Sequence, residues 1–130
     1  MLNTFSTDTF RSRCDDLALN DADLASIIRA HGYPPMWNRP NTFETLVHII
    51  LEQQVSLASA LSALNKLRER IVEITPQKVL LLSDEELRAC YFSRQKTIYT
   101  RGLANELSSG RLDLSSLAAL PDDEVRATLI

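Results

Sequence analysis

The apolar residues between positions 43 and 71 recur at helical spacing in two consecutive runs. Those of the first run lie at i, i+3, i+4, i+7 and i+8 and share one helix face: Phe43, Leu46, Val47, Ile50 and Leu51. Those of the second run again share one face: Leu57, Leu61, Leu64 and Ile71. Ser56 stands where it can cap the second run. The pattern predicts two amphipathic helices joined by a short polar bend.

Capping patterns predict further helix starts on both sides of this pair. They are Asn20 with Asp23, Asn41 with Glu44, Thr75-Pro76, Ser83 with Glu86, Ser93, and Pro121 followed by three acids. Gly32 and Gly110 are predicted to end the helices that precede them. The helix after Ser93 carries Ile98, Tyr99, Leu103 and Leu107. Three prolines between residues 33 and 40 exclude regular helix and predict a rigid, extended connector.

No stretch of strand length alternates apolar and polar residues between turn signals. The fold class is therefore predicted to be all-α, a multi-helix bundle with about seven to nine short helices. A chain of 130 residues, 45% of them hydrophobic, suffices for one domain with a proper core. We expect residues 1–130 to form a single all-α domain.

Composition narrows the class of protein. No apolar run approaches the roughly 20 residues that cross a bilayer, and the N-terminus lacks the features of a secretory signal. Cys14 and Cys90 form no Cys-x-x-Cys motif, so structural thiols in a reducing compartment are favoured over redox or metal chemistry. We expect a cytoplasmic or nucleoid-associated protein. A net charge of −3 does not by itself indicate a polyanion partner.

The segment from Pro121 to Ile130 ends on two apolar residues. Exposed apolar ends are unusual in natural domains, so either this last helix packs tightly or the chain is a portion of something longer. The second reading is favoured. In a shortened form, such an apolar helix is also a surface for self-association.

The bend between the first two helices holds a glutamine pair, Gln53-Gln54. Burying an amide without a partner costs free energy, so the pair is expected to be exposed at a helix end or joined in a hydrogen-bond network. An exposed pair can present polar groups to a ligand, whereas a networked pair only bridges helices.

The order of these features resembles the alkylation-repair branch of the helix-hairpin-helix DNA glycosylases, the DNA-3-methyladenine glycosylase II type. The resemblance starts from the segment leading to His31-Gly32 and continues through Phe43-Glu44-Thr45-Leu46-Val47 to Gln53-Gln54-Val55-Ser56. It runs on through Thr75-Pro76 and Ser93-Arg94-Gln95-Lys96, so that it covers about residues 15 to 130. One departure is Tyr91, where the family usually has a glycine.

The resemblance implies a monofunctional base-excision-repair enzyme that flips alkylated bases of the 3-methyladenine type from double-stranded DNA and hydrolyses their glycosidic bonds. Gln54 matches the residue that fills the vacated stack, with Gln53, Val55 and Ser56 alongside. A glutamine is flat and long, and it both donates to and accepts from base edges. The alternative is that Gln54 caps or bridges neighbouring helices.

The family's catalytic aspartate follows a hairpin of the form Leu-x-Gly-Ile-Gly-x-Trp-Thr. This chain has three glycines, Gly32, Gly102 and Gly110, and none forms Gly-x-Gly. The hairpin and its aspartate are therefore absent, and the segment 125–130 resembles the approach to them. We predict no catalytic residue, no cofactor and no excision activity for these 130 residues alone. The alternative function is a non-catalytic helical scaffold or protein-interaction module.

Aromatic residues in the proline connector are candidates for a base pocket. Flipped bases are held between aromatic or apolar side chains, and Tyr33 and Trp37 stand ahead of the Phe43 helix. For Trp37 the interpretation as a core residue is preferred to the pocket. Tyr91, Phe92 and Tyr99 are interpreted as packing residues.

The charged residues suggest a site for DNA phosphates but not a metal site. Arg94, Lys96 and Arg101 cluster after Ser93, and Lys66, Arg68 and Arg70 cluster on the second helix. Arg94 and Lys96 are the predicted phosphate contacts because they flank a helix N-terminus. Glu44, His48 and Glu52 lie four apart, but i,i+4 pairing explains this spacing, so no metal site is predicted.

Overall fold

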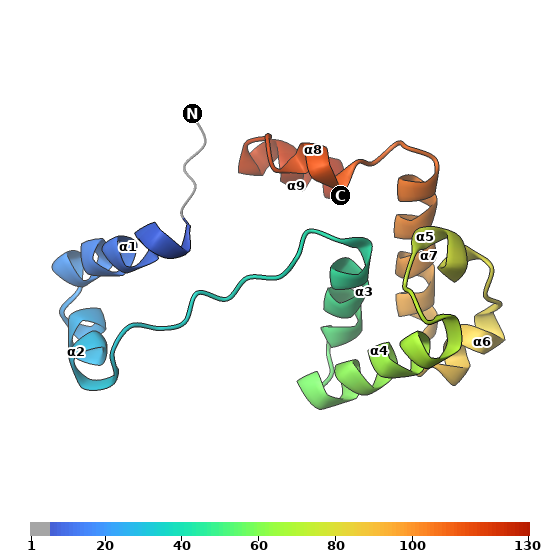
Figure 1. Cartoon of the computed structure of the whole chain (residues 1–130), viewed down its shortest axis with the longest axis horizontal. Coiled ribbons are helices and arrows are strands. Elements are labelled where there is room, and N and C mark those ends of the chain that lie inside the picture. The colour runs from blue at the N-terminus through green and yellow to red at the C-terminus, as the bar shows by residue number, and fades with distance from the viewer. Residues whose placement is uncertain (1–5) are drawn as a thin grey trace. The chain divides into compact units, whose positions relative to one another are not determined.

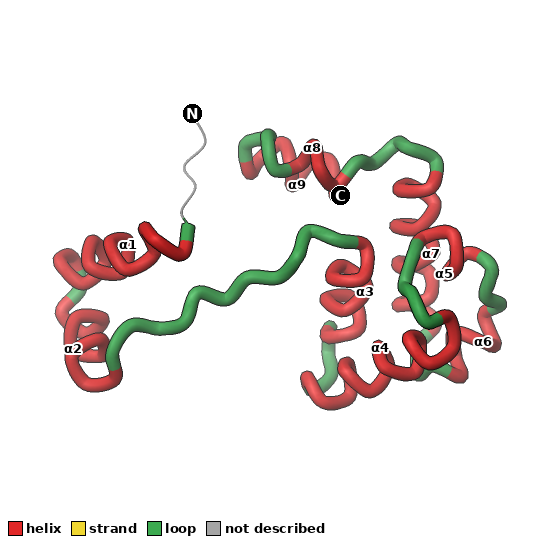
Figure 2. Tube along the Cα trace, in the orientation of Figure 1, coloured by secondary structure: helices red, strands yellow, loops and turns green. Residues whose placement is uncertain are grey.

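The computed structural model describes residues 6–130 and is all-helical over that range, which confirms the predicted fold class (Figure 2). Nine α-helices follow one another in this part of the chain (Figure 1): α1 Thr7–Asn20, α2 Ala22–His31, α3 Phe43–Glu52, α4 Leu57–Ile71, α5 Pro76–Leu80, α6 Asp84–Ala89, α7 Arg94–Ser108, α8 Leu114–Leu117 and α9 Asp122–Leu129. They fall into two compact units, one ending at Arg39 and the other running from Pro40 to Ile130.

The first unit is a pair of packed helices, α1 and α2, followed by an extended segment. No capping pattern had predicted α1. The cap of α2 is Asp21 and not Asn20 as predicted, because the Asp21 carboxylate accepts from the backbone N–H groups of Asp23 and Leu24 at 2.9 and 3.0 Å. The Asn20 amide instead donates back to the Asp16 carbonyl oxygen at 2.9 Å. Residues 32–40 contain no helix, as the prolines require.

Local capping also sets the helix starts of the second unit. The Ser56, Thr75, Ser83 and Ser93 hydroxyls each accept from a backbone N–H three residues on, at 3.1 or 3.2 Å, as predicted. At α3 the prediction was wrong: Thr42 is the cap, and it accepts from the Thr45 N–H at 3.2 Å. The Asn41 amide donates instead to the Leu114 carbonyl oxygen at 2.7 Å, which ties the start of α8 to the chain ahead of α3.

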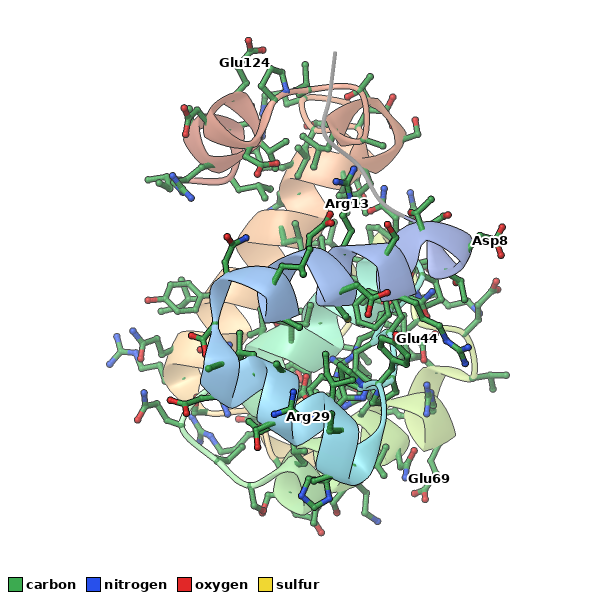
Figure 3. All side chains as sticks on the ribbon, turned by 90° about the vertical axis from the view of Figure 1, so that its left-hand side faces the viewer. Asp8, Arg13, Arg29, Glu44, Glu69 and Glu124 are labelled. Carbon is green, nitrogen blue, oxygen red and sulfur yellow. The ribbon has the colours of Figure 1, made fainter. Side chains whose placement is uncertain are left out.

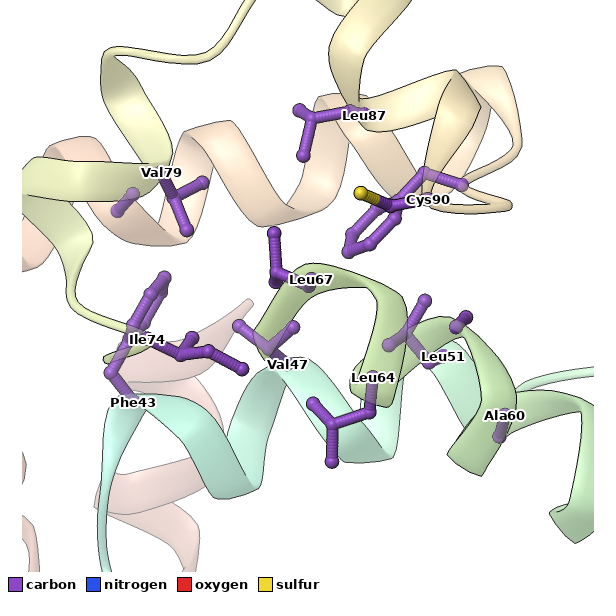
Figure 4. Close-up of a cluster of buried hydrophobic side chains, with 13 residues drawn as sticks. Phe43, Val47, Leu51, Ala60, Leu64, Leu67, Ile74, Val79, Leu87 and Cys90 are labelled. Carbon is purple, nitrogen blue, oxygen red and sulfur yellow. The ribbon is translucent and has the colours of Figure 1, made fainter. Parts of the chain in front are cut away.

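The core of the second unit lies where α3, α4, α5, α6 and α7 meet, and Leu67 stands at its centre between Val47 and Leu87 (Figure 4). The predicted face of α3 is confirmed, since Phe43, Val47 and Leu51 are buried.

The predicted face of α4 was correct only in part, since Leu64 is buried and Ile71 packs against the core. Helix α4 buries Ala60, Ala63, Leu64 and Leu67, whereas Leu57 and Leu61 are exposed. Helix α7 buries Thr97, Thr100 and Ala104, whereas Ile98 and Tyr99 are more than half exposed. Small side chains at the contact allow helix axes to approach closely, and this close approach selects the buried face.

Helices α8 and α9 complete the second unit. The Asp113 carboxylate caps α8 by accepting from the Ser115 N–H at 3.0 Å. Asp122, Asp123 and Glu124 occupy the first turn of α9, as the acids after Pro121 predicted, but α9 has no side-chain cap hydrogen bond within the described residues. No helix within residues 6–130 is long and apolar enough to cross a bilayer.

Candidate functional site: the turn between α3 and α4

The glutamine pair forms the turn that ends α3. Gln53 has φ −66° and ψ 126°, as at the first central position of a type II β-turn, and Gln54 has the positive φ, 61°, that the second central position requires. A positive φ at the second position favours glycine, so a glutamine there is a strained choice. Both residues are exposed. The turn therefore holds Gln54 at an apex that points out of the core.

The two amides differ in what they contact. The Gln53 Nε2 donates to the Ile49 carbonyl oxygen at 3.1 Å, so this side chain folds back on its own helix. The Gln54 side chain makes no hydrogen bond to any residue in the described range, so it neither caps nor bridges helices there. After the pair, Val55 is 44% exposed, and Ser56 is engaged as the cap of α4. Gln54 is thus the member of the pair whose amide is available to a ligand.

Lys96 links this turn to the start of α7. Its ammonium donates to the Leu51 carbonyl oxygen at 2.8 Å, across 45 positions of sequence. That oxygen belongs to the last turn of α3, where carbonyl groups lack helical partners and the helix dipole favours a cation. Lys96 is therefore engaged in holding the end of α3 against α7.

Most of the other cations considered as phosphate contacts are paired with carboxylates. Lys66 lies 3.6 Å from Glu69, whose side chain projects outward from α4 (Figure 3), and Arg70 lies 2.6 Å from Glu86. Arg68 pairs with Glu44, and Arg101 pairs with Asp84. Arg94 is exposed and forms no ion pair within residues 6–130. Arg94 is thus the cation of these two clusters that is free to meet a phosphate.

A groove of about 330 Å³ opens beside the turn. Its walls come from the end of α3, the turn, the first half of α4, the turn before α7, and α7 itself: Leu51, Val55, Ser59, Ala60, Ser62, Ala63, Tyr91 and Lys96. The groove is continuous with the glutamine turn through Val55. It offers two serine hydroxyls, one ammonium and one tyrosine ring beside four apolar side chains.

The residues predicted to form a base pocket belong to the first unit. Tyr33 lines a hollow of about 450 Å³ with residues of α1 and α2, and its hydroxyl donates to Asp15 Oδ1 at 2.6 Å. That hydrogen bond raises the pKa of Tyr33, and the Arg11 guanidinium lies 5.4 Å from the ring centroid. Trp37 is 91% exposed and outside this lining, so its interpretation as a core residue was wrong.

Tyr91 is the residue of this site that the sequence analysis missed. It was assigned to packing together with Phe92 and Tyr99, but only Phe92 is buried, and Tyr91 is 62% exposed with φ 67°. The sequence did contain a signal for this residue, because Tyr91 stands where the family that the chain resembles usually has a glycine.

Comparison with known proteins identifies the fold. The family model described as HhH-GPD superfamily base excision DNA repair protein matches residues 47–128. Among solved structures, a DNA-3-methyladenine glycosidase from Bacillus halodurans superposes with a TM-score of 0.75 at 28% sequence identity. The match covers 98% of this chain and 58% of that protein, so the chain spans less than two thirds of its length. No curated protein matches the chain.

Proposed function

Because the chain belongs to the HhH-GPD superfamily of base excision DNA repair proteins, we propose that it binds double-stranded DNA at damaged bases and inserts Gln54 into the base stack. The observation that carries the proposal is the state of Gln54, an exposed amide at the apex of a strained turn with no partner in the described part of the chain. Strain of this kind persists where the rest of the fold enforces it, and it is concentrated at functional sites.

In base flipping, the Gln54 amide takes the place of the extruded base. Extruding a nucleotide costs on the order of a few kcal/mol, less for a damaged base, and leaves a gap in the stack. The flat Gln54 amide fills such a gap and can bond either edge of the opposing base. Gln53, tied to Ile49, and Ser56, which caps α4, hold the turn on both sides, while Val55 adds apolar contact at its rim.

Phosphate contacts position the turn on the duplex. The exposed Arg94 is the first residue of α7, where the backbone N–H groups and the helix dipole also favour an anion. Lys96 acts from its place at the end of α3, so it contributes positive charge to the same side of the turn. These contacts carry no sequence information, which suits an enzyme family that searches DNA of any sequence.

We extend the proposal to alkylated bases, on the likeness to a DNA-3-methyladenine glycosidase. Tyr33 and Trp37 are the aromatic residues proposed to contact the flipped base. None of the glycines forms the Gly-x-Gly hairpin that precedes the catalytic aspartate, so we propose that these 130 residues recognise damage and do not excise it.

Duplex binding by paired variants tests the role of Gln54. Fluorescence anisotropy with a duplex carrying one abasic-site analogue is compared with the same duplex intact. We expect Gln54→Ala to weaken binding to the abasic duplex about tenfold and to leave intact-duplex binding nearly unchanged. Gln53→Ala is the matched control and should weaken binding to both duplexes to the same, smaller extent, because its amide supports the turn but contacts only its own helix. Equal losses for the two variants would remove Gln54 from the site.

The alternative, a non-catalytic helical module, is favoured by the missing Gly-x-Gly hairpin. Binding to the abasic duplex separates the two functions, because a scaffold or protein-interaction module has no reason to bind damaged DNA. Single-turnover release of 3-methyladenine and 7-methylguanine from alkylated DNA tests the lack of catalysis that both functions predict. We expect no release above the uncatalysed rate from the 130-residue chain, even where it binds the damaged duplex. Robust release would overturn the assignment of a binding role without catalysis.

A further inference from the structure

We propose that Tyr91 is a second DNA-contacting residue, whose ring stacks on a base of the strand that lies in the groove beside the Gln54 turn. This inference rests on the proposed function, because it takes DNA as the ligand. It adds a contact site on the turn between α6 and α7, more than thirty positions after the glutamine pair in the sequence.

The backbone at Tyr91 is held in a conformation that disfavours a tyrosine. After the last residues of α6, the Tyr91 N–H donates to the Arg88 carbonyl oxygen at 2.9 Å, and the Phe92 N–H donates to that of Leu87 at 3.1 Å. This pair of bonds is the Schellman motif, which places its left-handed residue at Tyr91, φ 67°. A glycine adopts this φ without steric cost, whereas a residue with a Cβ does not.

Nothing in the fold offsets that cost. The apolar contact that accompanies the motif is made by Leu87 and Phe92, which are both buried in the core. The Tyr91 side chain is 62% exposed, and its hydroxyl makes no hydrogen bond within residues 6–130. A large aromatic that strains its turn and adds little to the core points to a role outside folding.

The position of the ring identifies the ligand. Tyr91 lines the same groove as Val55, the residue next to Gln54, and the groove also contains the Lys96 side chain and the Ser59 and Ser62 hydroxyls. Within residues 6–130, three non-glycine residues have a positive φ, and two of them, Gln54 and Tyr91, therefore stand at one surface. A nucleic-acid strand supplies what this surface fits: bases that stack on an aromatic ring, and phosphates that attract an ammonium.

Substitution of Tyr91 by glycine separates a DNA-binding role from a structural one. A structural role predicts that the variant is less stable, whereas the DNA-binding role predicts that it is more stable and binds DNA more weakly. Tyr91→Gly should raise the midpoint of thermal unfolding by a few degrees and weaken binding to the abasic duplex about fivefold to hundredfold, the range of one lost base stack. The slope of log affinity against log salt should not change, because no phosphate contact is lost. Tyr91→Phe keeps the ring and should retain wild-type affinity within about twofold.

Val72→Gly is the matched control. Val72 also has a positive φ, 63°, but it lies at the end of α4 and outside the groove lining. Val72→Gly should stabilise the chain in the same way as Tyr91→Gly and leave DNA affinity unchanged. A duplex with 5-iodouracil beside the abasic analogue adds a direct readout, since irradiation should crosslink it to Tyr91.

The outcomes separate the two proposals. Wild-type affinity in Tyr91→Gly, or a crosslink that maps away from residue 91, would overturn this inference while the role of Gln54 stands. Failure of the wild-type chain to bind any duplex would overturn both. Weaker binding by the more stable glycine variant, with the control unaffected, would support the inference.

Discussion

The Lys96 ammonium lies 2.8 Å from the Leu51 carbonyl oxygen and so joins the first turn of α7 to the last turn of α3. Both residues also line the groove beside the glutamine turn. The position of that turn therefore depends on a charge-assisted hydrogen bond between helices that are distant in sequence.

Removing this bond should destabilise the chain and disturb the turn. Lys96→Met keeps most of the aliphatic stem and should lower the free energy of unfolding by about 1–2 kcal/mol, measured by urea denaturation. Lys66→Met is the control, because Lys66 has only a surface pair with Glu69 and should cost less than about 1 kcal/mol. A DNA salt slope lowered by about one in Lys96→Met would show that the ammonium also contacts a phosphate.

Val72 closes a rare type of turn at the end of α4. Its φ of 63° and ψ of −60° are those of a γ-turn with positive φ, the rare and strained form, and the Glu73 N–H closes the turn by donating to the Ile71 carbonyl oxygen at 2.7 Å. The side chain is 83% exposed, so its loss costs little burial. Val72→Gly should therefore stabilise the chain by about 1 kcal/mol. Val72→Ala retains a Cβ and should recover much less; an equal gain would show that β-branching and not the positive φ is the cause.

Thr100 carries a buried hydroxyl without a partner. The residue is fully buried on α7, and its Oγ1 makes no hydrogen bond to any described residue. An unsatisfied buried hydroxyl costs about 1–3 kcal/mol, so Thr100→Val should stabilise the chain by about 1 kcal/mol in urea denaturation. Thr100→Ser keeps the hydroxyl and loses the methyl group, and it should destabilise. Loss of stability in Thr100→Val would mean that the hydroxyl has a partner in solution, such as a buried water.

Glu86 makes the stability of the α6 region depend on pH. The hydrogen bond from Arg70, and a second one from the Ser83 backbone, hold the pKa of Glu86 below its ordinary value. A lowered folded-state pKa gives stability that is complete above the unfolded-state pKa and is lost as pH falls through the folded-state value.

Unfolding free energies measured in urea between about pH 6 and pH 3 test this expectation, since carboxyl groups titrate near the lower end of that range. Wild type should lose stability on acidification, and Glu86→Gln should lose less over the same interval. Arg70→Met should also flatten the profile, because the Arg70 bond is the largest cause of the shift. Identical profiles for wild type and both variants would remove Glu86 from the acid transition.

Most of the helix starts were predictable from the sequence, and two of the predicted caps were displaced by one residue. Ser56, Thr75, Ser83 and Ser93 cap as expected because the bond joins a side chain to an N–H three residues away, and both groups are visible in the local sequence. At α2 and α3 the predicted cap lay one residue too early, since Asn20 with Asp21 and Asn41 with Thr42 are adjacent pairs of competent caps. Backbone geometry chooses between such neighbours.

The candidate site was predictable only in part. The polar bend and its exposure followed from two glutamines between apolar helices, and both side chains are exposed. That Gln53 folds back while Gln54 stays unpaired did not follow, because the difference lies in the turn's dihedral angles. The engagement of Lys96 at Leu51 was hidden by their separation of 45 positions.

By itself, then, the sequence determined the helical class, most of the helix boundaries and the polar bend between α3 and α4, because these depend on interactions within one or two helical turns. The tertiary structure decided which side of α4 and of α7 is buried. Helix α7 turns Thr97, Thr100 and Ala104 inward and leaves Ile98 and Tyr99 exposed. The physical reason is that burial depends on how closely neighbouring helices approach, and small side chains permit the closest approach even where larger apolar residues are nearby.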